Sequence, residues 1–347
     1  MRSSFARSAA IVSLSFLSGA IAATSGYQLL KKIPLGAAEG GGEYFDYITL
    51  DASARRIYAS HGTEVQVLNA DTGALLGKIT GLKRCHGVAL VPELGKGFIS
   101  DGELGQVIIF DLKSFQKLGE AKAEDDADSI LYDTASKRIF VFNGRPKSAT
   151  VIDPASGAVT GRIDLGGAPE QAVADGKGTI FDNLEDTNEV VAIDSRTLKV
   201  KSRWPVAPVG QPVSIALDRK NRRLFIAGRN PKTLAMMDVD TGKIIGSPFP
   251  IGGRVDATVF DPATGFVAAS VGDGAIHVFH EDSPAKLVEV ETVKTEYGAK
   301  TMALDAKTHS LIVDTSDFEP PADPAAKGPG AQPRAKPGTF HVLIYSR

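Results

Sequence analysis

The sequence predicts an all-β protein built from repeated four-stranded antiparallel sheets, and two observations support this. Residues 214–253 read as four short strands joined by polar or glycine-containing turns. A single meander of this kind leaves both of its faces in water, so it requires neighbouring copies that bury them. The chain supplies such copies, because a short first strand begins again every 40 to 44 residues, seven times in all. A period of about 40 residues with four strands per unit indicates a seven-bladed β-propeller.

Residues 1–22 have the pattern of a secretory signal peptide. Two arginines precede an apolar run at 9–17, and Ala20-Ile21-Ala22 supplies the small residues of a cleavage site. The apolar run is shorter than the roughly 20 residues that span a bilayer. We therefore expect cleavage near Ala22, a periplasmic or secreted location, and no transmembrane segment in the mature chain. A single propeller domain is expected over 23–347.

Composition limits the partners and the kinds of site. The chain has 39 Lys and Arg against 41 Asp and Glu, and 37 against 41 once the two arginines of the signal peptide are removed. This mildly negative balance argues against nucleic acid or an anionic membrane as the partner. The single cysteine, Cys85, excludes an internal disulfide, a zinc finger and a CxxC redox site. Without a disulfide, the fold must be held together by packing alone. We also expect a monomer.

The strands of each unit differ in side-chain size. First strands such as 214–217 are rich in Gly, Ala, Ser and Thr, whereas second and third strands carry Ile, Val, Leu and Phe. This fits a propeller, whose blades converge toward the axis and leave room only for small side chains in the inner strands. In the turns after the third strands, residues such as Asp71 and Ser156 are expected to cap the turn, with glycine at the positive-φ position.

The seventh unit is predicted to be completed by the start of the mature chain. It ends at its third strand, 340–345, while 27–33 has the pattern of a fourth strand and leads into a Pro-Leu-Gly link. We expect this N-terminal strand to close the last blade and so remove an exposed edge. Within that blade, the Pro-, Ala- and Gly-rich segment 318–338 is expected to be an irregular loop between the second and third strands.

Residues 149–173, ATVIDPASGAVTGRIDLGGAPEQAV, resemble the repeat of the YncE-like (YVTN-repeat) seven-bladed propellers of bacterial exported proteins. The similar features are a third strand ending in Val-Ile-Asp, a Ser-Gly turn, and an Ile-x-Leu-Gly-Gly-x-Pro link that recurs at 206–212 and partly at 251–253. The resemblance covers essentially the whole mature chain. It departs at the Tyr-Val-Thr-Asn motif, which is replaced at 58–61 by Tyr-Ala-Ser-His. The resemblance implies a propeller and export, and no particular activity.

Charged residues recur at the position just before each first strand. In a propeller the links from fourth to first strands open onto one face, so these residues are predicted to surround the mouth of the central channel. Like charges gathered there raise one another's pKa unless a cation, a lysine or water screens them. We call this set the channel ring, and it consists of Asp46, His86, Asp128, Glu170, Val213, Asp256 and Lys300.

Three uses of the channel ring remain open. Its oxygens suit a hard divalent cation such as Ca²⁺, for which Asp46, Asp128, Glu170 and Asp256 are the candidate ligands. The same residues, together with His86 and Lys300, can bind a polar organic ligand. In the third interpretation they only cap the inner strands and hold channel water.

His61 and Cys85 offer a different metal site. His61 falls in the loop between the second and third strands of the first unit, and Cys85-His86 in the link into the second. Adjacent blades can bring these three residues to one face, where their nitrogen and sulfur atoms would suit a softer metal. Burial as an inert thiol is the favoured alternative for Cys85.

These observations favour an exported binding scaffold that recognises a protein, a peptide or a small polar ligand at the channel mouth. The alternative is a metal-dependent enzyme of the lactonase or lyase type, in which a cation bound by the ring carboxylates acts as a Lewis acid and His86 as acid or base. Single-stranded nucleic acid is disfavoured by the charge balance and by the scarcity of aromatic residues for stacking. The sequence demands no cofactor, and Ca²⁺ or another divalent cation is the one that the channel ring would suit.

Overall fold

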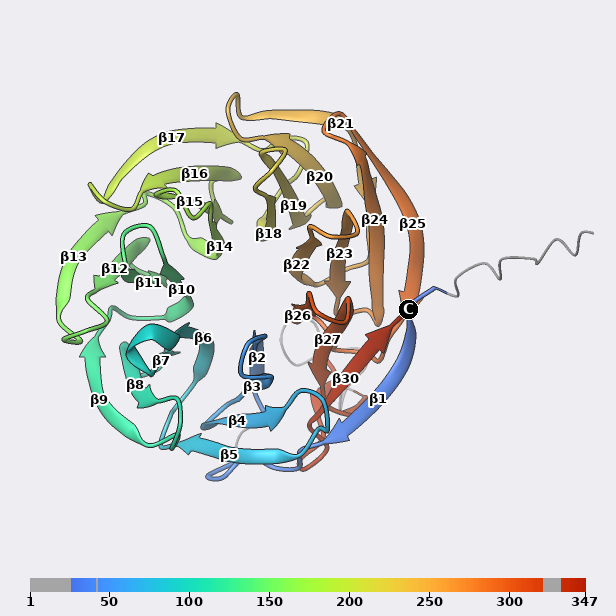
Figure 1. The fold of residues 1–347 in the computed structure, drawn as a ribbon. Coiled ribbons are helices and arrows are strands. Elements are labelled where there is room, and N and C mark those ends of the chain that lie inside the picture. Colours follow the sequence, from blue (N-terminus) through green and yellow to red (C-terminus); the bar gives the residue numbers. More distant parts are fainter. Residues whose placement is uncertain (1–25, 42, 321–331) are drawn as a thin grey trace, which may run out of the picture.

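The described residues form seven four-stranded antiparallel sheets arranged in a ring (Figure 1). The computed structural model describes residues 26–41, 43–320 and 332–347, so the predicted signal peptide (1–22) and most of segment 318–338 lie outside the described residues. The prediction of an all-β, seven-bladed propeller is confirmed. Among the described residues no helix is long and apolar enough to cross a membrane.

Each blade runs from an innermost strand near the centre of Figure 1 to an outermost strand at its rim. The innermost strands are β2 (Phe45–Asp51), β6 (Cys85–Val91), β10 (Ala127–Asp133), β14 (Pro169–Ala174), β18 (Pro212–Asp218), β22 (Val255–Asp261) and β26 (Met302–Asp305). The second strands are β3 (Arg56–His61), β7 (Lys96–Asp101), β11 (Arg138–Asn143), β15 (Thr179–Leu184), β19 (Arg223–Arg229), β23 (Phe266–Val271) and β27 (Ser310–Thr315).

The outer half of each blade is formed by a third and a fourth strand. The third strands are β4 (Glu64–Asn69), β8 (Gln106–Asp111), β12 (Ser148–Ile152), β16 (Glu189–Asp194), β20 (Lys232–Asp238), β24 (Ala275–Ser283) and β30 (His341–Ser346). The outermost strands are β5 (Leu75–Thr80), β9 (Lys117–Lys122), β13 (Val159–Asp164), β17 (Lys199–Pro205), β21 (Lys243–Pro250), β25 (Lys286–Lys294) and β1 (Gln28–Pro34).

The seventh blade has the strand order β26-β27-β30-β1, so the N-terminal strand closes the ring as predicted. β1 pairs antiparallel with β30, from Gln28 opposite Ser346 to Pro34 opposite His341. Between β27 and β30, the loop begins and ends with two short strands, β28 (Phe318–Glu319) and β29 (Arg334–Ala335), which pair with each other. A 3₁₀ helix, η1 (Pro92–Leu94), connects β6 to β7.

The core lies between blades, in clusters of buried apolar side chains that join each sheet to the next. Between the seventh and first blades, Ile33 and Ile344 pack with Ile48 and Ile57. Burying a side chain of this size stabilises the fold by roughly 1.5–3 kcal/mol relative to exposing it. An open ring would expose these side chains and lose that stabilisation. Gly87 on β6 shows why inner strands need small residues, because a Cβ there would come within 2.8 Å of Ile130 on β10.

In the turns between third and fourth strands, the predicted cap at Ser156 is confirmed, because its hydroxyl oxygen accepts a hydrogen bond from the backbone N–H of Ala158 at 3.2 Å. The turn after β4 is instead capped two residues earlier than predicted. Asn69 accepts hydrogen bonds from the backbone N–H groups of Asp71 and Thr72, at 3.0 and 2.8 Å. Asp71 itself instead pairs with Arg55, at 2.8 Å, so its predicted capping role is wrong. The reason is that the last residue of the third strand reaches the free N–H groups of the turn as an Asx turn. Gly73 does take the expected positive φ, at 80°.

Candidate functional site

Six of the seven channel-ring residues lie in β-bulges at the start of the innermost strands, and Lys300 lies just before β26. In β2, Phe45 pairs with His61 and Ile48 with Ala59, so two residues face one residue of β3. The same kind of register shift occurs in β6, β10, β14, β18 and β22. A bulge redirects side chains out of the regular alternation of a strand. The repeat thus places a redirected side chain at an equivalent point of six blades.

Hydroxyl groups of neighbouring strands fix the backbone of the ring. Thr301 donates to the carbonyl of Asp46 at 2.9 Å, which joins the seventh blade to the first. Ser100 on β7 donates to the carbonyl of Asp128 in the next blade, and Ser270 on β23 does the same for Lys300. Several ring residues are therefore held by the adjacent blade as well as by their own strand.

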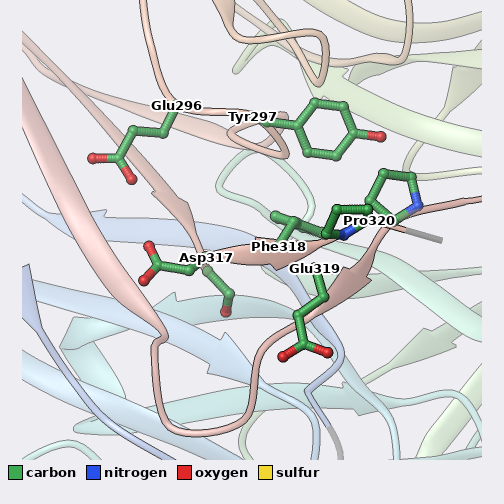
Figure 2. A pocket seen from close by; sticks show the side chains of 8 residues that line it. Glu296, Tyr297, Asp317, Phe318, Glu319 and Pro320 are labelled. Carbon is green, nitrogen blue, oxygen red and sulfur yellow. The ribbon is translucent and has the colours of Figure 1, made fainter. Parts of the chain in front are cut away.

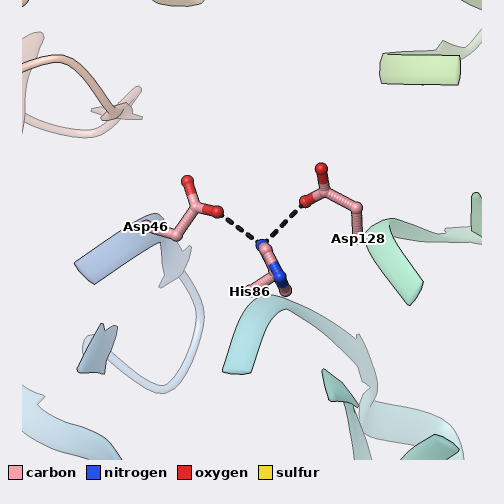
Figure 3. A group of neighbouring side chains, drawn as sticks. All are labelled: Asp46, His86 and Asp128. Carbon is pink, nitrogen blue, oxygen red and sulfur yellow. Dashed lines mark hydrogen bonds and ion pairs between the residues drawn. The ribbon is translucent and has the colours of Figure 1, made fainter. Parts of the chain in front are cut away.

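Asp46, His86 and Asp128 come from three neighbouring blades and meet around one nitrogen (Figure 3). His86 Nδ1 lies 2.6 Å from Asp46 Oδ2 and 3.0 Å from Asp128 Oδ1. Tyr44 adds a third oxygen, because its hydroxyl donates to Asp46 Oδ2 at 2.5 Å and lies 3.0 Å from His86 Nδ1. His86 is only 2% exposed. The sequence predicted all of these side chains at the channel except Tyr44.

His86 and Asp46 stabilise each other's charged form. Burial alone would lower the pKa of His86, but Asp128 and Asp46 outweigh that effect and raise it to about 10. Burial likewise opposes ionisation of Asp46, yet Lys300 and hydrogen bonds from His86 and Tyr44 hold the pKa of Asp46 well below its usual range. At neutral pH the group therefore contains an imidazolium beside an ionised Asp46. Asp128 differs, because burial raises its pKa despite the nearby His86.

Lys300 and Arg229 form a second charged group on the other side of Asp46. Lys300 lies 3.5 Å from Asp46 Oδ1 and also pairs with Asp256 Oδ2. Arg229, at the end of β19, pairs with Asp256 and lies 3.7 Å from Glu185. Burial disfavours the charge of Lys300, but Asp256 and Asp46 outweigh it and raise the pKa of the lysine. On this side of the ring each carboxylate faces a cation.

Glu170 and Asp182, on β14 and β15 of the fourth blade, form a carboxyl-rich group. Burial, together with the charges of Asp128, Asp256 and Glu185, raises the pKa of Glu170 well above its usual value. Asp182, on β15, is fully buried, and neither carboxyl oxygen has a side-chain or water partner among the described residues. Burial raises its pKa well above the usual range. Val213, the uncharged member of the ring, is buried in the core.

His61 and Cys85 lie apart from this cluster. Cys85 is buried, its thiol donates to the carbonyl of Glu64 at 3.2 Å, and burial raises its pKa to about 12. The ring of His61 stacks on Phe340 at 4.1 Å, and its Nε2 lies 3.2 Å from Glu43. Among the described residues, neither group of potential ligand atoms within 4.8 Å of one another contains His61 or Cys85. The structure therefore does not bring these two residues together with His86 as a ligand set.

The second such group lies away from the channel ring and consists of Glu296, Asp317 and His341. It borders a pocket of about 540 Å³ lined also by Tyr297 and Phe318 (Figure 2). Glu296 already accepts hydrogen bonds from Lys32 at 2.9 Å, and lies 2.9 Å from His341 Nε2. Because this pocket adjoins the part of the loop that is not described, the channel ring is the better-defined candidate site.

Tyr44 could have been found in the sequence by extending the register two residues upstream. Arg84 and Arg254 lie at the same distance before His86 and Asp256. In the structure the guanidinium of Arg84 lies 4.9 Å from the ring centre of Tyr44, and that of Arg254 lies 4.8 Å from the ring of Tyr297. Tyr44, Arg84 and Arg254 thus share one position of the repeat, two residues before a channel-ring residue.

Comparisons with known proteins agree on the fold. No protein-family model matches the sequence, and no curated protein matches it. Among solved structures, a chain of the mitotic checkpoint complex has a TM-score of 0.72 and 13% identity, and the match covers 97% of this chain and 99% of that one.

Two further solved structures show the same likeness. U3-55K has a TM-score of 0.72 at 9% identity, with 89% of this chain and 97% of that chain covered. A chain of hydrazine synthase from Kuenenia stuttgartiensis has a TM-score of 0.69 at 13% identity, with 80% and 96% covered. At such low identity these similarities establish a shared propeller fold and nothing about activity.

Proposed function

We propose that the protein is a binding scaffold whose channel ring takes up a positively charged group of a protein, a peptide or a small polar ligand. The observation that carries this proposal is the carboxyl-rich side of the ring. There, burial and the charges of Asp128, Asp256 and Glu185 disfavour the ionised form of Glu170. A cationic group bound beside Glu170 would remove that penalty.

The opposite side of the ring supports the choice of an ammonium group. There, Lys300 sits between Asp46 and Asp256 and supplies the charge that both carboxylates need. A ligand ammonium beside Glu170 would do the same for the carboxyl-rich side. A partner that presents a lysine side chain fits this chemistry, and one similar propeller chain was solved in the mitotic checkpoint complex.

The test is calorimetric titration of the purified protein with a lysine-containing peptide and with its acetyl-lysine counterpart. Cadaverine and the neutral pentanediol provide a matched small-molecule pair. We expect binding of the ammonium probes only, weakened about tenfold or more by Glu170→Gln, which corresponds to about 1.4 kcal/mol. Glu120→Gln is the matched control, because Glu120 is exposed on the outer strand β9 and, among the described residues, forms an ion pair with Lys117 alone. Equal binding of charged and neutral probes would refute the proposal.

A metal-dependent enzyme of the lactonase or lyase type is the second candidate. It is favoured by the convergence of Asp46, His86 and Asp128, whose potential ligand atoms lie within 4.8 Å of one another. A cation bound by ring carboxylates would polarise a carbonyl oxygen of the substrate. A panel of lactones and esters, assayed with the EDTA-treated and the metal-loaded protein, tests this. Turnover that does not depend on metal would argue against it.

We further propose that the chain is an exported, YncE-like propeller. The support is the signal-peptide pattern of 1–22 and the repeat text of 149–173. Expression of the full chain in a bacterial host, followed by fractionation and N-terminal sequencing, tests it. We expect a periplasmic or secreted protein that begins just after Ala22. Recovery of the uncleaved chain in the cytoplasm would count against export.

A further inference from the structure

We propose that Asp46, His86 and Asp128 bind one divalent transition-metal ion of the Zn²⁺ class, with an open coordination position toward the centre of the ring. This site is distinct from the Glu170 side, so the inference does not rest on the binding function proposed above. It also differs from the two metal sites suggested by the sequence, which were four ring carboxylates and the group of His61, Cys85 and His86.

The first argument is the number of acceptors around His86 Nδ1. This one nitrogen faces oxygens of Asp46, Asp128 and Tyr44, at 2.6, 3.0 and 3.0 Å. A single N–H makes one well-aligned hydrogen bond, and the bond to Asp46 uses it. Asp128 Oδ1 is consequently a buried oxygen that accepts no hydrogen bond from the described residues. A metal ion can bind the nitrogen and both carboxylates at once, which a proton cannot do.

The second argument is distance. Two atoms that each lie about 2.1 Å from a tetrahedral zinc ion are about 3.4 Å apart. The two nitrogen–oxygen distances here are 2.6 and 3.0 Å. A small outward rotation of the two carboxylates is therefore enough to admit the ion. The ion replaces a proton on Nδ1, which leaves to water.

The third argument is that the ligands are held before any ion arrives. Asp46 is oriented by the hydroxyl of Tyr44 and has its carbonyl bound by Thr301. The carbonyl of Asp128 is bound by Ser100. Outer contacts of this kind fix ligand geometry and raise affinity. We assign Tyr44 to this positioning role, because its hydroxyl donates to Asp46 Oδ2 at 2.5 Å and lies 3.0 Å from His86 Nδ1.

The donor set decides the metal class. Calcium takes six to eight oxygen ligands, whereas imidazole nitrogen and carboxylate oxygen both bind zinc, and three protein ligands leave its fourth position open. The Asp128 side chain is 24% exposed, so the open position can be reached by water or a ligand.

The experiment is titration of the EDTA-treated, dialysed protein with Zn²⁺ by calorimetry, and with Co²⁺ by visible absorption. We expect one tightly bound ion and a Co²⁺ spectrum of a four-coordinate site with mixed nitrogen and oxygen ligands. His86→Gln and Asp128→Asn should each weaken binding at least about 100-fold, beyond the 10- to 100-fold effect typical of outer contacts. Circular dichroism melting shows whether each variant folds. If His86→Gln does not fold, the nearly isosteric Asp128→Asn carries the test.

Three controls separate this site from its neighbours. Glu170→Gln tests the proposed ammonium site and should leave Zn²⁺ affinity within a few-fold. Asp256→Asn removes a ring carboxylate that pairs with Lys300 and is outside the ligand set, so it should also have little effect. His341→Gln removes the other group of potential ligands. Absence of Zn²⁺ binding, binding unchanged by His86→Gln and Asp128→Asn, or binding abolished by His341→Gln would overturn the proposal.

Discussion

The two sides of the channel ring occupy the same position of the repeat but differ in charge compensation. On one side Lys300 and Arg229 neutralise Asp46 and Asp256. On the other, no ion pair among the described residues involves Glu170, and Asp182 is buried without a charged partner. The repeat therefore determines where a side chain points, while its partners in other blades determine what it can do. On the first side the carboxylates are paired with cations, whereas on the second burial raises the pKa of Glu170 and of Asp182 well above the usual range.

If removing Lys300 left the free energy of unfolding unchanged, the contrast between the two sides of the ring would be wrong. Lys300→Met removes the cation that Asp46 and Asp256 share and leaves them with His86 and Arg229 as their remaining partners. We expect a loss of about 2–4 kcal/mol in the free energy of unfolding, reduced somewhat by solvent because the lysine side chain is 23% exposed. Urea denaturation at neutral pH measures this. Lys232→Met is the control, since Lys232 is 59% exposed and lies 3.9 Å from Asp273. A loss as small as that of the control would show that the ring charges are screened.

Asp314, on β27, is a buried carboxyl group that should make the stability of the protein depend on pH. Burial raises its pKa to about 8, against the hydrogen bond from Thr301 and the charge of Lys300, while an unfolded aspartate titrates near about 3.9. The folded state then holds the proton more tightly, so this contribution to stability is fully present below about pH 3.9 and is lost as pH rises to about 8.

Asp314→Asn removes this titration and keeps the shape of the side chain. We expect the stability difference between variant and wild type to shift in favour of the variant by on the order of 2–4 kcal/mol between pH 4 and 8. Urea denaturation of both proteins across that range measures the shift. A difference that stays constant with pH would show that Asp314 is ionised in the folded protein.

Asp182 sharpens the comparison from the carboxyl-rich side. Its place in β15, opposite Ala172, corresponds to that of Val141 in β11, opposite Ile130. Because its carboxyl oxygens are buried and no side chain among the described residues is hydrogen-bonded to them, Asp182→Val should stabilise the protein by about 1–2 kcal/mol. Thermal melting measures this, with Val141→Asp as the reciprocal variant that should destabilise. A destabilised Asp182→Val would mean that the carboxyl group has a structural partner.

Glu170→Gln is expected to have the smallest effect on folding. It removes a charge that burial and three neighbouring carboxylates disfavour, so the free energy of unfolding should be unchanged or higher by up to about 1 kcal/mol. Urea denaturation of the ligand-free protein measures it. A clear destabilisation would place Glu170 in the structural side of the ring and remove the contrast between the two sides.

The architecture could be predicted from the sequence because each blade repeats the same strand pattern at a nearly constant period. Even the closure by β1 followed, since the seventh unit lacked a fourth strand and the N-terminus offered one. The same period identified the residue just before each first strand as a member of the channel ring. The pairings could not be found, because Lys300 and Asp46 are far apart in sequence and meet only when the ring closes. The bulges, which decide where Asp46 and Asp128 point, leave no mark in residue type.

The pairing of β1 with β30 ties the outcome of folding to the order of synthesis. β1 is the earliest of the described strands to leave the ribosome and β30 is the latest, yet each is the other's neighbour. β1 must therefore wait unpaired while the blades between them form. A chain cut short anywhere before β30 keeps an unpaired first strand and an open ring. The seventh blade can therefore form only when both β1 and β30 are present.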